Sequence, residues 1–180
     1  MKVIAICGLP GAGKSTAIGA IRDLGSVIVM GDIIRNEALN RNIEPTSENL
    51  GKIAKELRLK YGLNIIAKKC VDLINQQKDN IIFIDGLRSM EEVNVFREHW
   101  KFPIVAIIID EKKRFERLFK RARSDDPKSL ADLKERDKRE ILFGLEEVLN
   151  NADYSIKNDS TINDLKKRVR NVVLDLIHNY

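Results

Sequence analysis

The sequence has little of what marks disulfide-bonded, secreted or membrane proteins. Its 180 residues include two cysteines, Cys7 and Cys70, too few for a disulfide framework or a cysteine-rich metal cluster. No apolar run reaches the length of a membrane-spanning helix, and the first residues lack the order of regions found in signal peptides. We therefore expect a single cytoplasmic domain over residues 1–180, without a membrane partner.

Histidine is also scarce, and basic residues do not gather as they do in nucleic-acid-binding proteins. His99 and His178 lie near expected helix ends in charged surroundings, so we assign neither to catalysis. The net charge of +5 arises from 32 basic and 27 acidic residues that alternate along the chain. The basic run at 166–170 contains no aromatic side chain on which a base could stack. Nucleic-acid binding is not indicated.

Short apolar runs alternate with longer amphipathic stretches. The runs predict strands at 2–7, 26–30, 81–85, 104–110 and, more weakly, 154–156. The amphipathic stretches predict helices at 14–24, 33–40, 47–77 (broken near Tyr61-Gly62), 89–100, 112–121, 130–150 and 161–178. Continuous apolar strands separated by helices predict an α/β fold, a five-stranded parallel sheet flanked by helices. Right-handed crossovers then bring the carboxyl ends of the strands to one edge, where ligands bind.

Two segments exceed what such a sheet requires. Residues 32–79 are far more than one crossover helix needs, and we interpret them as a helical insert that holds an acceptor. The polar stretch that opens residues 121–139 has little to bury, and we interpret this region as a short lid. Both would lie beside the same edge of the sheet.

The most specific motif follows the first strand directly. Residues 8–16 read Gly-Leu-Pro-Gly-Ala-Gly-Lys-Ser-Thr, the P-loop pattern G-x-x-x-x-G-K-[ST], between a strand and a helix. Glycines let the backbone N–H groups curl around phosphate oxygens, and the lysine reaches the β- and γ-phosphates. The predicted ATP-binding residues here are Gly8, Pro10, Gly11, Ala12, Gly13, Lys14, Ser15 and Thr16.

Asp85 ends the third strand, in the position of a Walker B acid. With the Ser15 hydroxyl it would hold Mg²⁺ beside the P-loop, directly or through water. The alternative is that Asp85 caps the following helix. Because no second acid stands beside it to activate water, the pattern weakly favours phosphoryl transfer to an acceptor over hydrolysis.

Arginines gather before the expected lid. Arg117 and Arg121 share a helical face, and Arg123 follows where that helix frays. Guanidinium groups suit the spread charge of a transferring phosphoryl group, so Arg121 and Arg123 are candidate catalytic residues with Lys14 and Asp85. The alternative is a solvated helix face. Arg136 and Arg139 are weaker candidates, since both can pair with acids beside them.

Together these motifs resemble the nucleoside monophosphate kinase superfamily, above all adenylate kinase and in part dephospho-coenzyme A kinase. The chain is most similar to small archaeal proteins described as related to these kinases. The resemblance rests on residues 8–16, on Gly31-Asp-Ile-Ile-Arg35, on Asp85-Gly-Leu-Arg88 and on Arg117-x-x-x-Arg121. It implies that Asp32, Arg35 and Arg88 belong to the acceptor site, with Arg35 gripping the acceptor phosphate.

The same resemblance implies roles for residues of the later segments. Arg117 would stack on the ATP base, Arg121 would contact phosphates, and Arg123 would contact the transferring phosphate. Asn158, in a stretch similar to the last strand and loop of dephospho-coenzyme A kinases, would border the nucleotide base.

The acceptor segment departs from the adenylate kinase pattern. The arginine of Asp85-Gly-Leu-Arg88 comes one residue early, and the glutamine that reads adenine in those kinases is missing. We therefore expect a Mg²⁺-dependent kinase, monomer or small homo-oligomer, whose acceptor is AMP, another nucleoside monophosphate or a nucleotide-like molecule. The alternatives are a nucleotide-binding regulatory module and an acceptor-independent NTPase.

Overall fold

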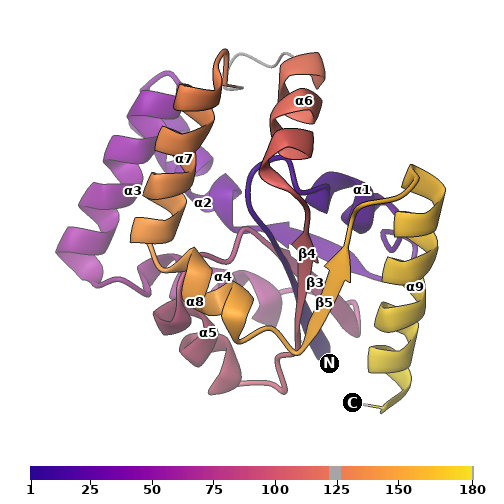
Figure 1. Ribbon diagram of the computed structural model, residues 1–180. Helices are drawn as coiled ribbons and strands as arrows, with labels where there is room; N and C mark the ends of the chain where they lie inside the picture. The colour runs from indigo at the N-terminus through magenta and orange to yellow at the C-terminus, as the bar shows by residue number, and fades with distance from the viewer. Residues whose placement is uncertain (122–126, 180) are drawn as a thin grey trace.

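The computed structural model describes residues 1–121 and 127–179, which contain a five-stranded, all-parallel sheet (Figure 1). The strands are β1 (Lys2–Cys7), β2 (Ser26–Val29), β3 (Ile81–Asp85), β4 (Ile104–Ile108) and β5 (Tyr154–Lys157). Their order in the sheet is β2-β3-β1-β4-β5. The predicted α/β P-loop fold class is confirmed.

Helices connect the strands and cover both faces of the sheet. They are α1 (Lys14–Gly19), α2 (Met30–Asn40), α3 (Ser47–Tyr61), α4 (Ile65–Asn75), α5 (Met90–Arg97), α6 (Glu111–Arg121), α7 (Leu130–Leu142), α8 (Leu145–Asn150) and α9 (Ile162–Asn179). In Figure 1, α1 and α9 lie on the right of the sheet, and α4, α5 and α8 on the left.

Alternate residues of the central strands feed two separate cores. Along β1, Val3, Ala5 and Cys7 pack with the layer of α4, α5 and α8, whereas Ile4 and Ile6 pack with α1 and α9. Neighbouring side chains of a strand point to opposite faces, so a strand covered on both faces must be apolar throughout. This explains the continuous apolar runs of the sequence.

Glycines account for two helix boundaries. The stretch 47–77 breaks at Gly62, as predicted, where φ is +98°. The stretch 130–150, predicted as one helix, is two, because Gly144 takes a left-handed conformation with φ of +103° between α7 and α8. The first helix also ends at Gly19, five residues before the predicted end.

Within the described residues, no helix combines the length and the apolar character needed to cross a membrane.

The centre of the sheet should dominate stability. Phe83 of β3 is fully buried against the α1 and α9 layer, so Phe83→Ala should lower the free energy of unfolding by about 3–5 kcal/mol in urea titrations. Phe119 of α6 is 60% exposed, and Phe119→Ala, the matched control, should change it by less than about 0.5 kcal/mol. Similar losses in both variants would contradict the assignment of the core.

Candidate active site

The predicted P-loop connects β1 to α1 at the carboxyl edge of the sheet. It runs close against β4: a Cβ at Gly8 would lie 2.6 Å from the backbone oxygen of Ile107. Since real Cβ atoms do not approach an oxygen so closely, only glycine at position 8 allows the loop to run so near the backbone of β4.

The Lys14 ammonium lies within the loop. Its Nζ donates to the carbonyl oxygens of Gly8 (2.7 Å) and Leu9 (3.3 Å). Burial lowers the pKa of Lys14, while the nearby carboxylates of Asp85 and Glu140 act in the opposite direction. The charges of two carboxylates, one at the end of β3 and one on α7, therefore act on this amine.

Asp85 reaches the same place from the neighbouring strand. The parallel register of β1 and β3 pairs Ile6 with Asp85, so the carboxylate stands beside the start of the P-loop. Burial raises the pKa of Asp85, Lys14 opposes the shift, and the negative charge of Asp32 adds to it. Asp85 thus ends its strand beside the P-loop, where its charge and that of Lys14 act on each other.

Asp32 and Arg35 lie one turn apart on α2, where they form a hydrogen-bonded ion pair. Each side chain is about half exposed, and both act on the pKa of Asp85 through their charge. The helix begins at Met30, directly after β2, so Asp32 stands in its first turn and not in a loop. The acceptor candidates of α2 therefore border the Asp85 carboxylate.

Arg88 is held from two sides by acids that the sequence analysis did not select. Its Nε contacts the Glu140 carboxylate of α7 at 3.0 Å, and its backbone N–H donates to Glu92 at 2.9 Å. Glu92, 1% exposed, also accepts a hydrogen bond from Arg58 of α3 at 2.9 Å. This buried ion pair ties the 32–79 segment to the loop after β3.

A second buried pair joins α6, α7 and the P-loop. Arg114 donates both guanidinium ends to Asp137, at 2.9 and 2.6 Å, and also donates to the Pro10 carbonyl at 3.1 Å. Asp137 and Glu140 are the acids expected from the sequence to pair with Arg136 and Arg139 of the same helix, and their contacts with Arg114 and Arg88 were not predicted. The available signal in the sequence was the position of Arg114 one helical turn before the apolar Leu118, and the structure buries both.

Arg117 and Asn158, predicted to lie near the nucleotide base, are in contact. Arg117 Nη2 lies 3.3 Å from both the backbone oxygen and Oδ1 of Asn158. Asn158 Nδ2 in turn donates to the Ala12 carbonyl at 2.7 Å. The two residues are thus connected to the backbone of the P-loop.

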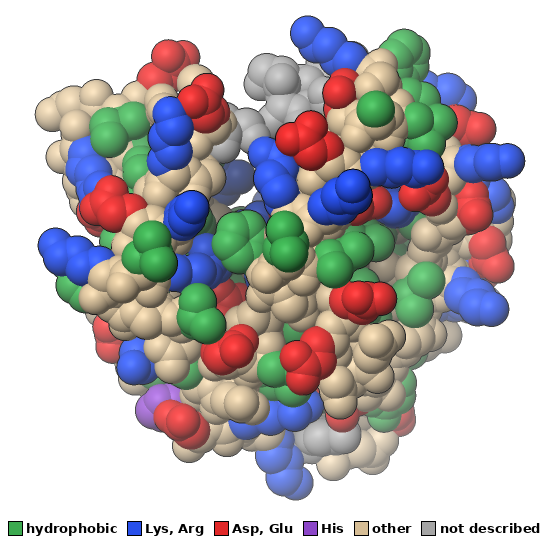
Figure 2. Space-filling model, turned by 60° about the vertical axis from the view of Figure 1, so that its left-hand side comes forward, with side chains coloured by type: hydrophobic (Ala, Val, Ile, Leu, Met, Phe, Trp, Pro, Cys, Tyr) green, Lys and Arg blue, Asp and Glu red, His purple; other side chains and the backbone are tan. Residues whose placement is uncertain are grey.

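The remaining candidates lie at the margins of this cluster. Ser15 is exposed at the start of α1, next to half-buried Thr16. Arg121 is the exposed last residue of α6, and Arg123 lies outside the described residues. Figure 2 shows a hollow in one face of the molecule with lysine and arginine side chains around it.

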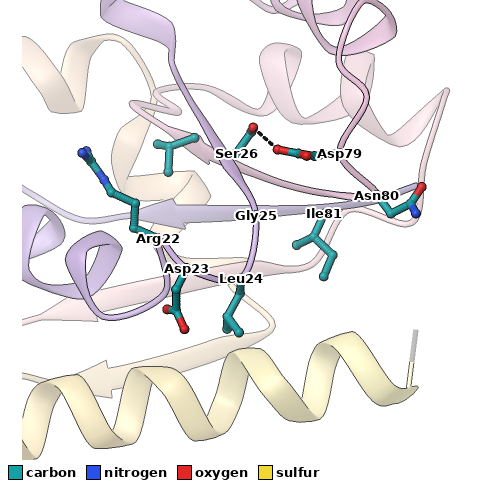
Figure 3. Close-up of a pocket in the computed structure, with 9 residues that line it drawn as sticks. Arg22, Asp23, Leu24, Gly25, Ser26, Asp79, Asn80 and Ile81 are labelled. Carbon is teal, nitrogen blue, oxygen red and sulfur yellow. Dashed lines mark hydrogen bonds between the residues drawn. The ribbon is translucent and has the colours of Figure 1, made fainter.

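A separate groove of about 680 Å³ lies at the end of the sheet where β2 and β3 begin, opposite to the end that carries the P-loop (Figure 3). It is lined by Arg22, Asp23, Leu24, Gly25, Ser26, Val27, Asp79, Asn80 and Ile81. These residues precede or begin β2 and β3, whereas the P-loop follows the end of β1. Among the described residues, none of the predicted site residues lines this groove.

The sheet order, the P-loop and the acid at the end of β3 define a P-loop protein with a kinase-like α/β fold. TT1252 from Thermus thermophilus has this fold, with a TM-score of 0.65 and 17% identity over 97% of each chain. So does the shikimate kinase from Acinetobacter baumannii solved in complex with shikimate, with a TM-score of 0.58 and 13% identity over 97% of this chain and 94% of that one. At such identities the likeness establishes the fold alone.

The chain belongs to the UPF0200 protein family. It is 43% identical over 181 residues to the UPF0200 protein of Methanoregula boonei, covering 99% of this chain and 97% of that protein. It is also 43% identical over 184 residues to the UPF0200/UPF0201 protein of Archaeoglobus fulgidus, and spans 57% of that protein's length. Residues 4–142 match the family model described as an AAA domain.

The raised pKa of Asp85 predicts that this carboxylate destabilises the fold. Because its charged form is stabilised better in the unfolded chain, stability falls as pH rises from the ordinary value of 3.8 through the raised pKa. Asp85→Asn should therefore raise Tm by a few degrees at neutral pH, and the difference should vanish below the ordinary pKa. Asp72→Asn on the exposed face of α4 is the control for calorimetry. A lower Tm for Asp85→Asn would mean that attraction to Lys14 outweighs burial.

Proposed function

We propose that the protein is an ATP-dependent phosphotransferase that moves the γ-phosphate of Mg-ATP to a phosphate-bearing acceptor, with AMP as the first candidate. The observation that carries this proposal is the strand register, which sets the P-loop with Lys14 beside Asp85 at one edge of the sheet, where the charges of Arg35 and Arg88 also act on Asp85. Positioning and electrostatic stabilisation provide most of the acceleration in phosphoryl transfer, and these residues supply both.

ATP would bind with its phosphates in the P-loop. Lys14 would exchange the carbonyls of Gly8 and Leu9 for the β- and γ-phosphate oxygens, a favourable exchange because a desolvated ammonium gains a charged partner. Arg121 lies at the end of α6 and would contact the phosphates, with Arg123 after it. Residues 121–139 would then cover the phosphates as the lid, with α7 held in place by the Arg114–Asp137 pair.

The residues present suit Mg²⁺. A hydroxyl and a single carboxylate, from Ser15 and Asp85, are oxygen ligands of the kind Mg²⁺ takes alongside water and phosphate. The raised pKa of Asp85 marks a desolvated carboxylate that a nearby cation would favour in its charged form. Bound there, the metal would neutralise charge on the β- and γ-phosphates.

The acceptor would lie under residues 32–79, with its phosphate between Arg35 and Arg88. Both arginines already hold carboxylates, Asp32 and Glu140 respectively, and a phosphate would replace a carboxylate on each guanidinium. The resemblance to adenylate kinase and dephospho-coenzyme A kinase supports this arrangement. In it Arg35 orients the acceptor, and closure over the site excludes the water that would otherwise hydrolyse ATP.

Phosphorus NMR of the protein with Mg-ATP and single acceptors tests the function. Nucleoside monophosphates and dephospho-coenzyme A form the panel, and we expect a new phosphorylated product from one of them. Lys14→Ala should reduce its formation at least about 100-fold, because a donor to the transition state is lost, while exposed Lys52→Ala should not. Phosphate released whatever the acceptor would instead indicate an NTPase. Nucleotide binding without any product would indicate a regulatory module.

Arg35 provides a test of the acceptor site. Arg35→Ala should raise the acceptor KM by roughly 10–100-fold, because a charge-assisted hydrogen bond is lost. The Kd for ATP, measured by calorimetry, should stay within about twofold, since Arg35 stands on α2 and not in the P-loop. Arg41→Ala, at the other end of α2, is the control. An unchanged acceptor KM would show that the acceptor binds elsewhere.

A further inference from the structure

Asn158 is a buried polar residue, and both ends of its side-chain amide are hydrogen-bonded to the protein. It follows β5 and is 3% exposed. Its backbone N–H donates to Ile108 of β4 at 2.7 Å, its Nδ2 donates to the Ala12 carbonyl at 2.7 Å, and its Oδ1 accepts from Arg117 at 3.3 Å. One N–H and one lone pair of the amide remain, but a side chain so deeply buried offers little surface to a nucleotide base.

We propose that Asn158 is a positioning residue for the phosphate-binding loop, acting through the backbone of Ala12 and not through the base. The inference rests on the proposed function only in that the P-loop binds a polyphosphate. It gives Asn158 a different task from the one that the family resemblance implies.

The hydrogen bond to Ala12 fixes the direction of the next backbone N–H group. The carbonyl of Ala12 and the N–H of Gly13 belong to one planar unit and point in opposite directions. Because Asn158 Nδ2 holds the Ala12 oxygen on the buried side, the Gly13 N–H is turned to the other side of the loop. P-loops bind phosphate through N–H groups turned inward in this way.

The third glycine of the motif supports the same conclusion. A Cβ at Gly13 would lie 2.3 Å from Asn158 Nδ2, and Gly13 has φ of +106°. The Asn158 amide therefore occupies the space that any side chain at position 13 would need. The requirement for glycine there comes partly from a residue near the other end of the chain, since Ala12 and Asn158 are 146 positions apart.

Arg117 sets the orientation of the amide. Its guanidinium donates to both Oδ1 and the backbone oxygen of Asn158, and a guanidinium can only donate. Oδ1 must therefore face Arg117, which leaves Nδ2 facing Ala12. Arg117 thus acts on the P-loop through Asn158, whatever else it contacts.

Titration calorimetry with a ligand that has no base separates the two roles. The ligands are inorganic tripolyphosphate, ATP and GTP, and the proteins are the wild type, Asn158→Ala and Asn158→Leu, with exposed Asn163→Ala as control. If Asn158 positions the loop, Asn158→Ala should weaken all three ligands by the same factor, about 5–20-fold, and leave the ATP to GTP ratio unchanged. Asn163→Ala should match the wild type.

Asn158→Leu separates positioning from packing. Leucine is branched at the same carbon as asparagine but has no hydrogen-bond donor. The Tm of Asn158→Leu should therefore lie closer to that of the wild type than the Tm of Asn158→Ala does. Its affinity for tripolyphosphate should be no higher than that of Asn158→Ala. If leucine restored tripolyphosphate affinity, the role would be packing, and the proposal would be overturned. If Asn158→Ala weakened ATP and left tripolyphosphate unchanged, Asn158 would contact the base, and the proposal would again be wrong.

The wild type and Arg117 complete the test. A wild type that binds none of the three ligands would overturn this inference together with the proposed function. A wild type that binds them without phosphorylating an acceptor would leave the inference intact. Arg117→Ala and Asn158→Ala should be non-additive for tripolyphosphate, since one acts through the other. Additive losses would refute the coupling between them.

Discussion

The pairing of β1 with β3 is the constraint on which the site depends. It places the P-loop and Asp85 at adjacent strand ends, with Ile6 opposite Asp85. Burial at this edge disfavours the charged form of both groups. It therefore lowers the pKa of Lys14 and raises the pKa of Asp85. Burial therefore makes the charged form of each group costlier than it is in water, and a nearby opposite charge lowers that cost. Such a site is suited to ligands that bring charge of both signs, as a metal–polyphosphate complex does.

Arginine–carboxylate pairs attach the helical layer to this edge. The pairs seen in the described residues are Arg58–Glu92, Arg88–Glu140 and Arg114–Asp137. Each joins segments distant in the sequence, and the last two fix successive turns of α7 to the loop after β3 and to α6. Buried pairs add little net stability compared with apolar contacts, but an unpaired member is costly. Their main effect is to select one arrangement of α3, α6 and α7 around the site.

The sheet could be predicted from the sequence because burial on both faces leaves a local signal. The predicted limits of β1 and β3 match the structure, and the break at Gly62 follows from one glycine. The long-range ion pairs could not be predicted, because the sequence around a buried charged residue such as Arg114 or Glu92 does not differ clearly from that around a solvent-exposed one. A buried charged residue of a helix can be distinguished from a solvated one only by apolar residues at helical spacing, such as Leu118 four positions after Arg114. The contact between Asn158 and Ala12 had no local signal either.

The paired charges also constrain how the sequence can diverge. A substitution at Glu92, 1% exposed, leaves Arg58 buried without its carboxylate, and the reverse substitution leaves the carboxylate without its cation. Because Glu92 also accepts a hydrogen bond from the backbone N–H of Arg88, a change at either position is expected to require a compensating change at the other. The same holds for Arg114 and Asp137. Across relatives, the two members of each of these pairs should be substituted together, whereas an exposed acid such as Glu48 can be substituted alone.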